Sequence, residues 1–334
     1  MLERVDTQRL DAAHSIVKYI IPKVDSAGLF HPEHSLWAES GVYRAQLAGT
    51  LSVTGKLLNN DACIEAAKRI LYRMMEVRID KLWGVDWWWD HTIESPPKNW
   101  REENKTIEEG YTAPTNLFDL GLYYKVSKDD SILKDARESM QAMFDRWDYS
   151  KGNFHHMTLE HAALASWVWQ DVFPEFSSQQ KPIIEWVISR FVQEAPKDFP
   201  FMTAVRTVLL LATTGTTYLK SVIKPGIDSL LADPSRRYSH NYNDFRHNES
   251  TFDHVNNRAN IAVAILMKHF DLAAEETVYT KTSLYSYLSN WIDNMKAPGG
   301  SYFECKDIKT NRKFGQGSPA HYIPLWWILG ARIP

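Results

Sequence analysis

The chain has 334 residues, of which 44% are hydrophobic and 24% are charged, and its formal net charge is −3. This apolar content is enough for a continuous core, and without a basic stripe we expect no nucleic-acid partner. No apolar run reaches the ~18 residues of a membrane span, and the N-terminal segment lacks the apolar stretch of a secretory signal. Two cysteines without a CxxC pair argue against a disulfide framework or a thiolate zinc site, so we expect a soluble, cytoplasmic protein.

Apolar residues recur with helical spacing along most of the chain, and few segments alternate as strands do. A single helix is predicted at 8–23. Five pairs follow, at 40–56 with 61–77, 112–126 with 131–147, 157–173 with 179–194, 201–214 with 217–232, and 256–270 with 277–295. A last single helix is predicted at 319–331.

The unpaired helices at the two ends indicate how the chain closes. If the first packs beside the last, twelve helices form six hairpins, and the ring buries both ends of its apolar layer. We therefore predict an all-α fold, a single (α/α)6 toroid or barrel that spans residues 1–334 as one domain. An open chain of helical repeats is the alternative, and it would have more uniform loops.

Loop lengths alternate along the chain. Turns within a pair are short and rich in cap residues, as in LLNND before residue 62 and SKDD at 127–130. Connections between pairs are long except at 195–200; they span 24–39, 80–111, 148–156, 233–255 and 297–318. All precede the first helix of a pair, so we expect them at one mouth of the barrel, where inner-helix N-termini favour anions. Most histidines lie in these loops, and His161 lies in the first turns of an inner helix.

The densest candidate site is the segment WGVDWWWDHTIE at residues 83–94. Asp86 and Asp90 are four residues apart, so a helical turn places both carboxylates on one face. The three residues between them are Trp87, Trp88 and Trp89. This pattern indicates an acidic pair that binds a cation or ligand, backed by aromatic faces, with Asp86, Asp90 and His91 as candidate catalytic residues. The alternative is a tryptophan-rich loop that packs over the barrel, with Asp90 as a helix cap.

A second cluster is YSHNYNDFRHNE at residues 238–249, followed by Asp253. Asp244, Glu249 and Asp253 offer oxygen ligands for a hard divalent metal such as Mg²⁺. Arg246 and His247 are suited to an anion. The alternative is an ordinary polar loop whose Asn and Asp residues make local turns.

Weaker candidates lie elsewhere at the mouth. Tyr302 and Tyr322 cluster near the last inner helix, where they are candidates for the cavity wall. The His155–His156 pair with Glu160 is suited to metal binding or proton transfer. The alternative is a histidine near a helix cap whose hydrogen bonds are all made within the protein.

A P-loop, GxSxG, dinucleotide fingerprint and HExxH motif are all absent from the sequence, which disfavours kinase, Rossmann and serine-hydrolase chemistry. Three classes of function remain open. Carbohydrate lyases or hydrolases would use tryptophan platforms for sugars and a carboxylate pair or His/Tyr pair for protons. Enzymes that guide carbocations would use the same aromatic faces to stabilise positive charge. A helical binding module would show an exposed apolar groove and no turnover.

With WGVDWWWDH and NYNDFRHNE at the mouth, the paired helical pattern resembles, over most of the chain, the unusual fungal humulene synthases of tropolone sesquiterpenoid biosynthesis. The resemblance implies an α/α barrel and a sesquiterpene synthase, a carbon–oxygen lyase that ionises farnesyl diphosphate with Mg²⁺ and forms a humulene-type hydrocarbon. The two acidic clusters would hold Mg²⁺, and Arg246 and His247 would bind the diphosphate. The three tryptophans, with Tyr302 and Tyr322, would line the pocket for the hydrocarbon.

The sequence departs from ordinary terpene cyclases. Asp129-Asp130 begins like an aspartate-rich motif, but Leu133 stands where a third aspartate would. Asn243-Asp244 begins like the second metal motif, and its later spacing fails. No DxDD occurs, so a cyclisation started by protonation has no obvious acid. A metal site in this chain would therefore be built from different residues.

Overall fold

The computed structural model describes residues 2–31, 41–76, 112–146, 148, 156–190, 192–193, 221, 296–300, 305–306 and 313–314. The chain divides into two compact units. Unit 1 comprises Met1–Ile20, Pro32–Leu36 and Phe191–Ile333, and unit 2 comprises Ile21–His31, Trp37–Arg190 and Pro334.

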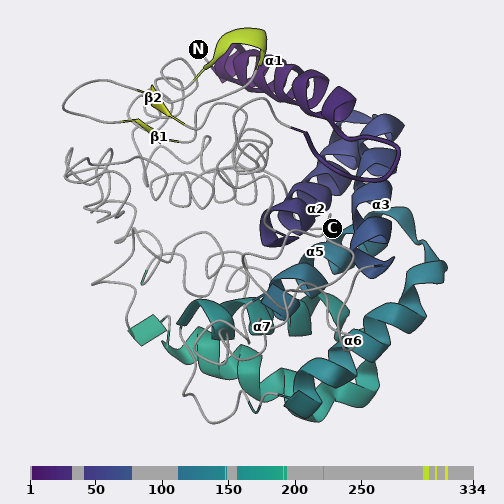
Figure 1. Cartoon of the computed structure of the whole chain (residues 1–334). Helices are drawn as coiled ribbons and strands as arrows, with labels where there is room; N and C mark the ends of the chain where they lie inside the picture. The colour runs from purple at the N-terminus through teal and green to yellow at the C-terminus, as the bar shows by residue number, and fades with distance from the viewer. Residues whose placement is uncertain are drawn as a thin grey trace. The chain divides into compact units, whose positions relative to one another are not determined.

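The described helices of unit 2 follow one another in pairs (Figure 1). α2 (Gly41–Leu58) pairs with α3 (Asp61–Glu76), and α5 (Thr112–Ser127) pairs with α6 (Leu133–Arg146). α7 (His156–Trp169) is followed by a helix at 177–190. Short 3-10 turns are η1 (Ile21–Lys23), η2 (Asp130–Ile132) and η4 (Pro174–Phe176). The helices predicted over these residues are confirmed, most with ends shifted by only a few residues.

The two helices of a pair differ in how they are buried. Burial is continuous over 47–55 in α2 and over 161–166 in α7, and in α5 only Phe118 interrupts it between 113 and 123. The second helices bury one face, with the spacing of an amphipathic helix. In α3 that face consists of Cys63, Ala66, Ala67, Ile70, Leu71 and Met74. α2 packs on α5 and α5 on α7, so these three helices form an inner layer, with α3 and α6 on its outer side (Figure 1).

The turns after α2 and α5 are built alike. Asn59 and Lys128 have left-handed backbones, with φ of 50° and 55°, which is a common way to end a helix. The next residue, Asn60 or Asp129, then accepts a hydrogen bond on its side-chain Oδ1 from the backbone N–H two residues further on, at 3.1 and 3.2 Å. Satisfying an N–H that the helix leaves unpaired is the role of a cap. The predicted turn chemistry is confirmed at both places.

An aromatic column joins the second pair of unit 2, α5 and α6, to the end of α7 and the turn that follows it. The Trp169 ring stacks between Tyr124 and Phe173, with centroid distances of 5.5 and 5.0 Å. Phe176 meets Phe173 edge-on at 6.3 Å and contacts Phe144 of α6 at 5.8 Å. Aromatic pairs of this kind contribute about 0.5–1.5 kcal/mol each beyond area burial. The chain has 13 Trp, 15 Tyr and 14 Phe, and part of this aromatic content is therefore used in packing.

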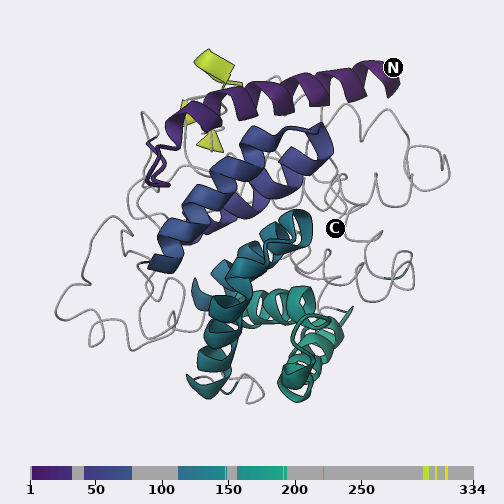
Figure 2. The same cartoon turned by 90° about the vertical axis from the view of Figure 1, so that its right-hand side faces the viewer.

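Unit 1 contains α1 (Leu2–Ile20), which Figure 2 shows as one long helix, together with η6 (Pro298–Gly300), β1 (Cys305–Lys306) and β2 (Lys313–Phe314). Ser15 of α1 donates its hydroxyl to the Gly300 carbonyl at 3.3 Å. Gly300 has φ 90°, and a Cβ there would overlap the Ser15 hydroxyl, so glycine fits this approach. β1 and β2 pair antiparallel, within the loop predicted at 297–318. None of the described helices is long and apolar enough to cross a membrane.

Candidate functional site

The residues predicted for the site lie outside the described residues, and their roles stay predictions. They are Asp86, Trp87, Trp88, Trp89, Asp90, His91, Asp244, Arg246, His247, Glu249, Asp253, Tyr302 and Tyr322. Within the described residues, no group of three or more His, Cys, Asp or Glu is placed to hold a metal ion. The predicted Mg²⁺ ligands are not among those residues, so the Mg²⁺ prediction is untested. The structure does describe three inner helices that the predicted mouth loops precede.

These inner helices bury polar side chains at positions where an ordinary core would be apolar. They are Thr50, Ser52 and Thr54 of α2, Thr115, Asn116 and Asp119 of α5, and His161 and Ser166 of α7. Buried polar groups are retained when they are hydrogen-bonded or have a role, because leaving them unpaired costs about 1–3 kcal/mol each. The Ser52 hydroxyl, for example, donates to the Ala48 carbonyl one turn earlier at 2.8 Å.

Asp119 is the most unusual of these side chains. It is 3% exposed, and its Oδ2 has no hydrogen-bond partner among the described residues. The carboxyl lies against Gly49 of α2, where an added Cβ would overlap Oδ1 and approach the Asp119 Cβ and Cγ to 2.9 Å. Burial raises the pKa of the Asp119 carboxyl well above its usual range, which favours the neutral acid. Sequence reasoning missed this residue, although a single carboxyl inside the apolar run LFDLGLYY is a visible signal.

The contacts of α5 define its sides. Gly121 packs against Val168 of α7, whereas Asp119 lies on the opposite side against α2. With 100° between successive residues, Phe118 falls on a side between these two, and it is the one half-exposed residue of the stretch 113–123. His161, seven residues before Val168, lies on the side of α7 that faces α5, and it is 5% exposed. The structure thus places a buried carboxyl, Asp119, and a buried imidazole, His161, in the inner layer. The Asp119 carboxyl is packed between α5 and α2.

Asp129-Asp130, the adjacent acidic pair, is part of the turn between α5 and α6. Both the Tyr72 hydroxyl of α3 and the Tyr123 hydroxyl of α5 donate to Asp129 Oδ2, at 3.0 and 2.9 Å. Partial burial would raise the pKa of Asp129, but hydrogen bonds from Ser131, Tyr123 and Tyr72 outweigh it and lower the pKa. The pair is therefore a structural junction between two hairpins, as its failure to complete an aspartate-rich motif indicates.

The loop predicted at 24–39 is described as far as residue 31. Val24 and Phe30 form an antiparallel bridge, and Gly28, with φ 81°, lies against the Arg69 carbonyl of α3. His31 Nε2 lies 2.8 Å from Asp25 Oδ2, and both side chains are more than a third exposed. This beginning of the loop lies along an outer helix, and its histidine forms a surface pair.

Comparisons with known proteins bear on the fold. No protein-family model matches the chain, and no curated protein matches it. A cellobiose 2-epimerase from Spirochaeta thermophila is similar in structure, with a TM-score of 0.69, 13% identity and coverage of 99% of this chain and 98% of that one. An α-1,6-mannanase, GH76A of Salegentibacter sp. HEL1_6, matches with a TM-score of 0.56, 11% identity and 98% of both chains. A polysaccharide lyase matches with a TM-score of 0.57 and 11% identity, over 97% of this chain and 53% of the lyase.

These likenesses span nearly the whole chain, and they show its fold. The chain has the all-α fold of (α/α)6 barrel enzymes, as the sequence predicts. In a variant of the mannanase, replacement of two adjacent aspartates gives an inactive protein.

The resemblance to fungal humulene synthases is wrong, and with it the assignment as a sesquiterpene cyclase acting on farnesyl diphosphate. Solved structures similar to this chain include sugar epimerases, glycoside hydrolases and a polysaccharide lyase. The identification rested on paired helices with aromatic and acidic loops, and these features do not separate it from the carbohydrate enzymes that the sequence leaves open. The Trp169 column also shows that some aromatic rings of the chain serve packing.

Proposed function

We propose that the protein is a carbohydrate-active enzyme that acts on an oligosaccharide or polysaccharide at the mouth of its barrel. The observation that carries the proposal is the likeness, over 97–99% of the chain, to enzymes whose reactions differ but whose substrates are all sugars. The long loops that the sequence places before the inner helices support it, since binding residues concentrate on loops held by a rigid scaffold.

Epimerisation, hydrolysis and elimination on a sugar share a need for positioned proton transfer. Epimerisation takes a proton from carbon and returns one to the other face. Hydrolysis gives a proton to the leaving oxygen while water adds, and elimination removes a proton as the C–O bond breaks. We assign this role to Asp86 and Asp90, with Trp87, Trp88 and Trp89 as stacking surfaces for sugar rings.

The test is to incubate the purified protein with cellobiose, α-1,6-linked manno-oligosaccharides and uronic-acid polymers, and to analyse products by mass spectrometry and NMR. An isomer of unchanged mass identifies an epimerase, shorter chains that have gained water a hydrolase, and unsaturated ends a lyase. A folded protein that leaves every one of these sugars unchanged would overturn the proposal.

Substitution separates the predicted site from the fold. Asp90→Asn should reduce turnover by at least about 10²-fold, because general acid–base groups contribute about 10²–10⁴. Glu65→Gln, an exposed carboxyl on α3, is the matched control and should leave turnover unchanged. Circular dichroism and the melting temperature of both variants should equal those of the wild type. Normal turnover in Asp90→Asn would remove this residue from the site while leaving the function standing.

Two further properties belong to the proposal. A single domain over residues 1–334 should unfold in one cooperative transition. A cytoplasmic location is supported by the cysteines, of which Cys63 is buried with a free thiol. Titration of the unfolded protein with a thiol reagent should then find both cysteines of the sequence reduced.

A further inference from the structure

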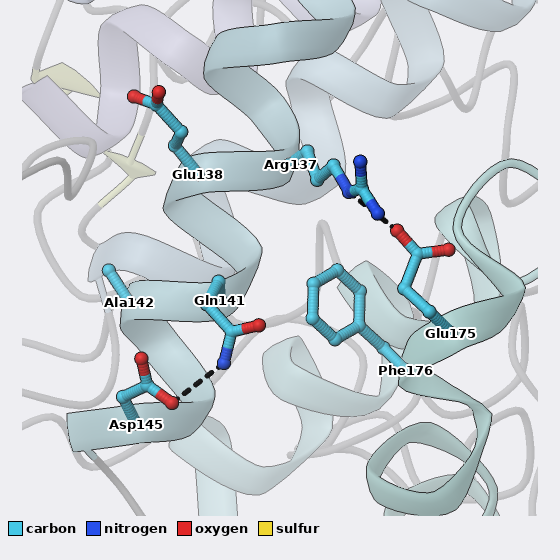
Figure 3. Close-up of a pocket in the computed structure, with 7 residues that line it drawn as sticks. All are labelled: Arg137, Glu138, Gln141, Ala142, Asp145, Glu175 and Phe176. Atoms are coloured by element: carbon cyan, nitrogen blue, oxygen red, sulfur yellow. Dashed lines mark hydrogen bonds and ion pairs between the residues drawn. The ribbon is translucent and has the colours of Figure 1, made fainter.

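A pocket of about 320 Å³ lies on the outer side of unit 2, between α6 and η4 (Figure 3). Its polar wall is a stripe along α6 that includes Arg137, Gln141 and Asp145, spaced one helical turn apart. Glu175 of η4 closes the other side. The volume is near the lower limit of small-molecule sites, which hold about 300–1,000 Å³.

Four polar side chains of the pocket form two pairs with one another. Arg137 Nε lies 2.7 Å from Glu175 Oε1, which joins α6 to η4. Gln141 Nε2 donates to Asp145 Oδ1 at 2.7 Å, one turn further along the helix. Figure 3 shows the Phe176 ring between these two pairs. Phe176 is 4% exposed and packs on Phe144 and Phe173, so it forms a rigid apolar floor.

The charge of the pocket restricts what it can bind. It contains the carboxyl groups of Glu138, Asp145 and Glu175 against the single guanidinium of Arg137, so an anion is disfavoured. The described residues include no group of three side chains placed for a metal. A wall made of a guanidinium, an amide and carboxylates offers both donors and acceptors, which suits hydroxyl groups, since each hydroxyl donates one hydrogen bond and accepts others.

We infer that this pocket is an auxiliary subsite for one neutral sugar residue of a longer glycan, on the outer wall of the protein. The inference rests on the proposed function, because a sugar polymer acted on at the mouth is the ligand that would reach a second site on the same molecule. The Arg137 guanidinium has five N–H groups, and its pair with Glu175 is formed at Nε. Its terminal N–H groups would donate to vicinal hydroxyls of the sugar. The sugar ring would rest over Ala142 and the edge of Phe176.

The experiment measures binding at the pocket itself. Hydrogen–deuterium exchange of peptides covering α6 and η4 is followed while soluble α-1,6-mannan or cello-oligosaccharides are added to the full chain. Chitosan oligomers are the cationic comparison. Gln141→Ala removes a donor and releases Asp145, whereas Ala142→Gln fills the pocket and leaves both polar pairs in place. Lys134→Ala is the matched control, an exposed residue of α6 outside the pocket.

The expected result is protection of α6 and η4 by a neutral glycan. The dissociation constant should rise about tenfold in Gln141→Ala, as loss of one or two hydrogen bonds predicts, and at least as much in Ala142→Gln, whose longer side chain occupies the space of the sugar. Lys134→Ala should bind as the wild type does, and turnover of a disaccharide should be unchanged in all three variants. Protection that is absent, that persists in both pocket variants, or that only chitosan produces would overturn the inference. Turnover without such protection removes the subsite alone, and protection without turnover removes the proposed function alone.

Discussion

Gly49 of α2 and Asp119 of α5 make a close contact between two inner helices, and Gly49→Ala tests it. The new methyl group would overlap Asp119 Oδ1 and come within 2.9 Å of the Asp119 Cβ and Cγ, so the carboxyl or the helices must move. Overpacking of this kind costs about 1–3 kcal/mol. The better helix propensity of alanine returns about 1 kcal/mol. We therefore expect a net loss of up to about 2 kcal/mol in the free energy of unfolding.

A double-mutant cycle shows whether this contact is the cause. Asp119→Ala removes Oδ1 and Cγ, two of the three atoms that the new methyl group would overlap, and leaves the Asp119 Cβ at 2.9 Å. The double variant should therefore be more stable than the sum of the single changes by about 1–2 kcal/mol. Urea unfolding followed by fluorescence measures all four proteins, and Lys56→Ala, exposed on the same helix, should stay within about 0.5 kcal/mol of the wild type. Additive effects of the two substitutions would refute the packing argument.

Three other predictions concern described residues. Because burial raises the pKa of Asp119, its stabilising neutral form is fully present below about pH 4, and stability is lost as pH rises toward the folded-state pKa. Asp119→Asn should therefore gain on the wild type by up to about 1.4 kcal/mol per pH unit in that range, and a constant difference in urea titrations would contradict this. Asp129 has a lowered pKa, so Asp129→Asn should cost about 1–3 kcal/mol at neutral pH, with the cost shrinking as pH falls below about 4; a cost independent of pH would count against the junction. Trp169→Phe removes the 2.8 Å bond from Nε1 to the Leu117 carbonyl, and should lower stability by about 1–3 kcal/mol and alter the near-ultraviolet dichroism; an unchanged melting temperature would disprove this role.

Helix positions in unit 2 are predictable because local signals agree there. Asn59-Asn60 and Lys128-Asp129 supply both a helix end and the next cap, so pattern and turn chemistry indicate the same boundary. After α7 the signals disagree. The apolar spacing continues to Phe173, but the helix ends at Trp169, because the aromatic column turns the chain before Pro174.

The partners of buried groups are harder to predict than the helices. Asp119 reads as a polar residue in an apolar run, and nothing local indicates that a glycine of another helix makes room for it. The function is harder still to predict from the sequence than these partners. Tryptophans and carboxylates in loops suit a sugar or a carbocation equally, since both are bound by aromatic faces. The choice depends on cavity shape, which residue types alone do not specify.

The junction at Asp129 has a consequence for how the molecule opens. Tyr72 belongs to the hairpin of α2 and α3, and Tyr123 to the hairpin of α5 and α6, yet both hydroxyls end on one carboxylate oxygen. Separating the two hairpins takes the Tyr72 hydroxyl away from a charged acceptor. We therefore expect the two hairpins to open as one foldon, so that their amides exchange with solvent through a common opening. A helical barrel assembled from repeats along the chain would in this part come apart in steps of four helices instead of two.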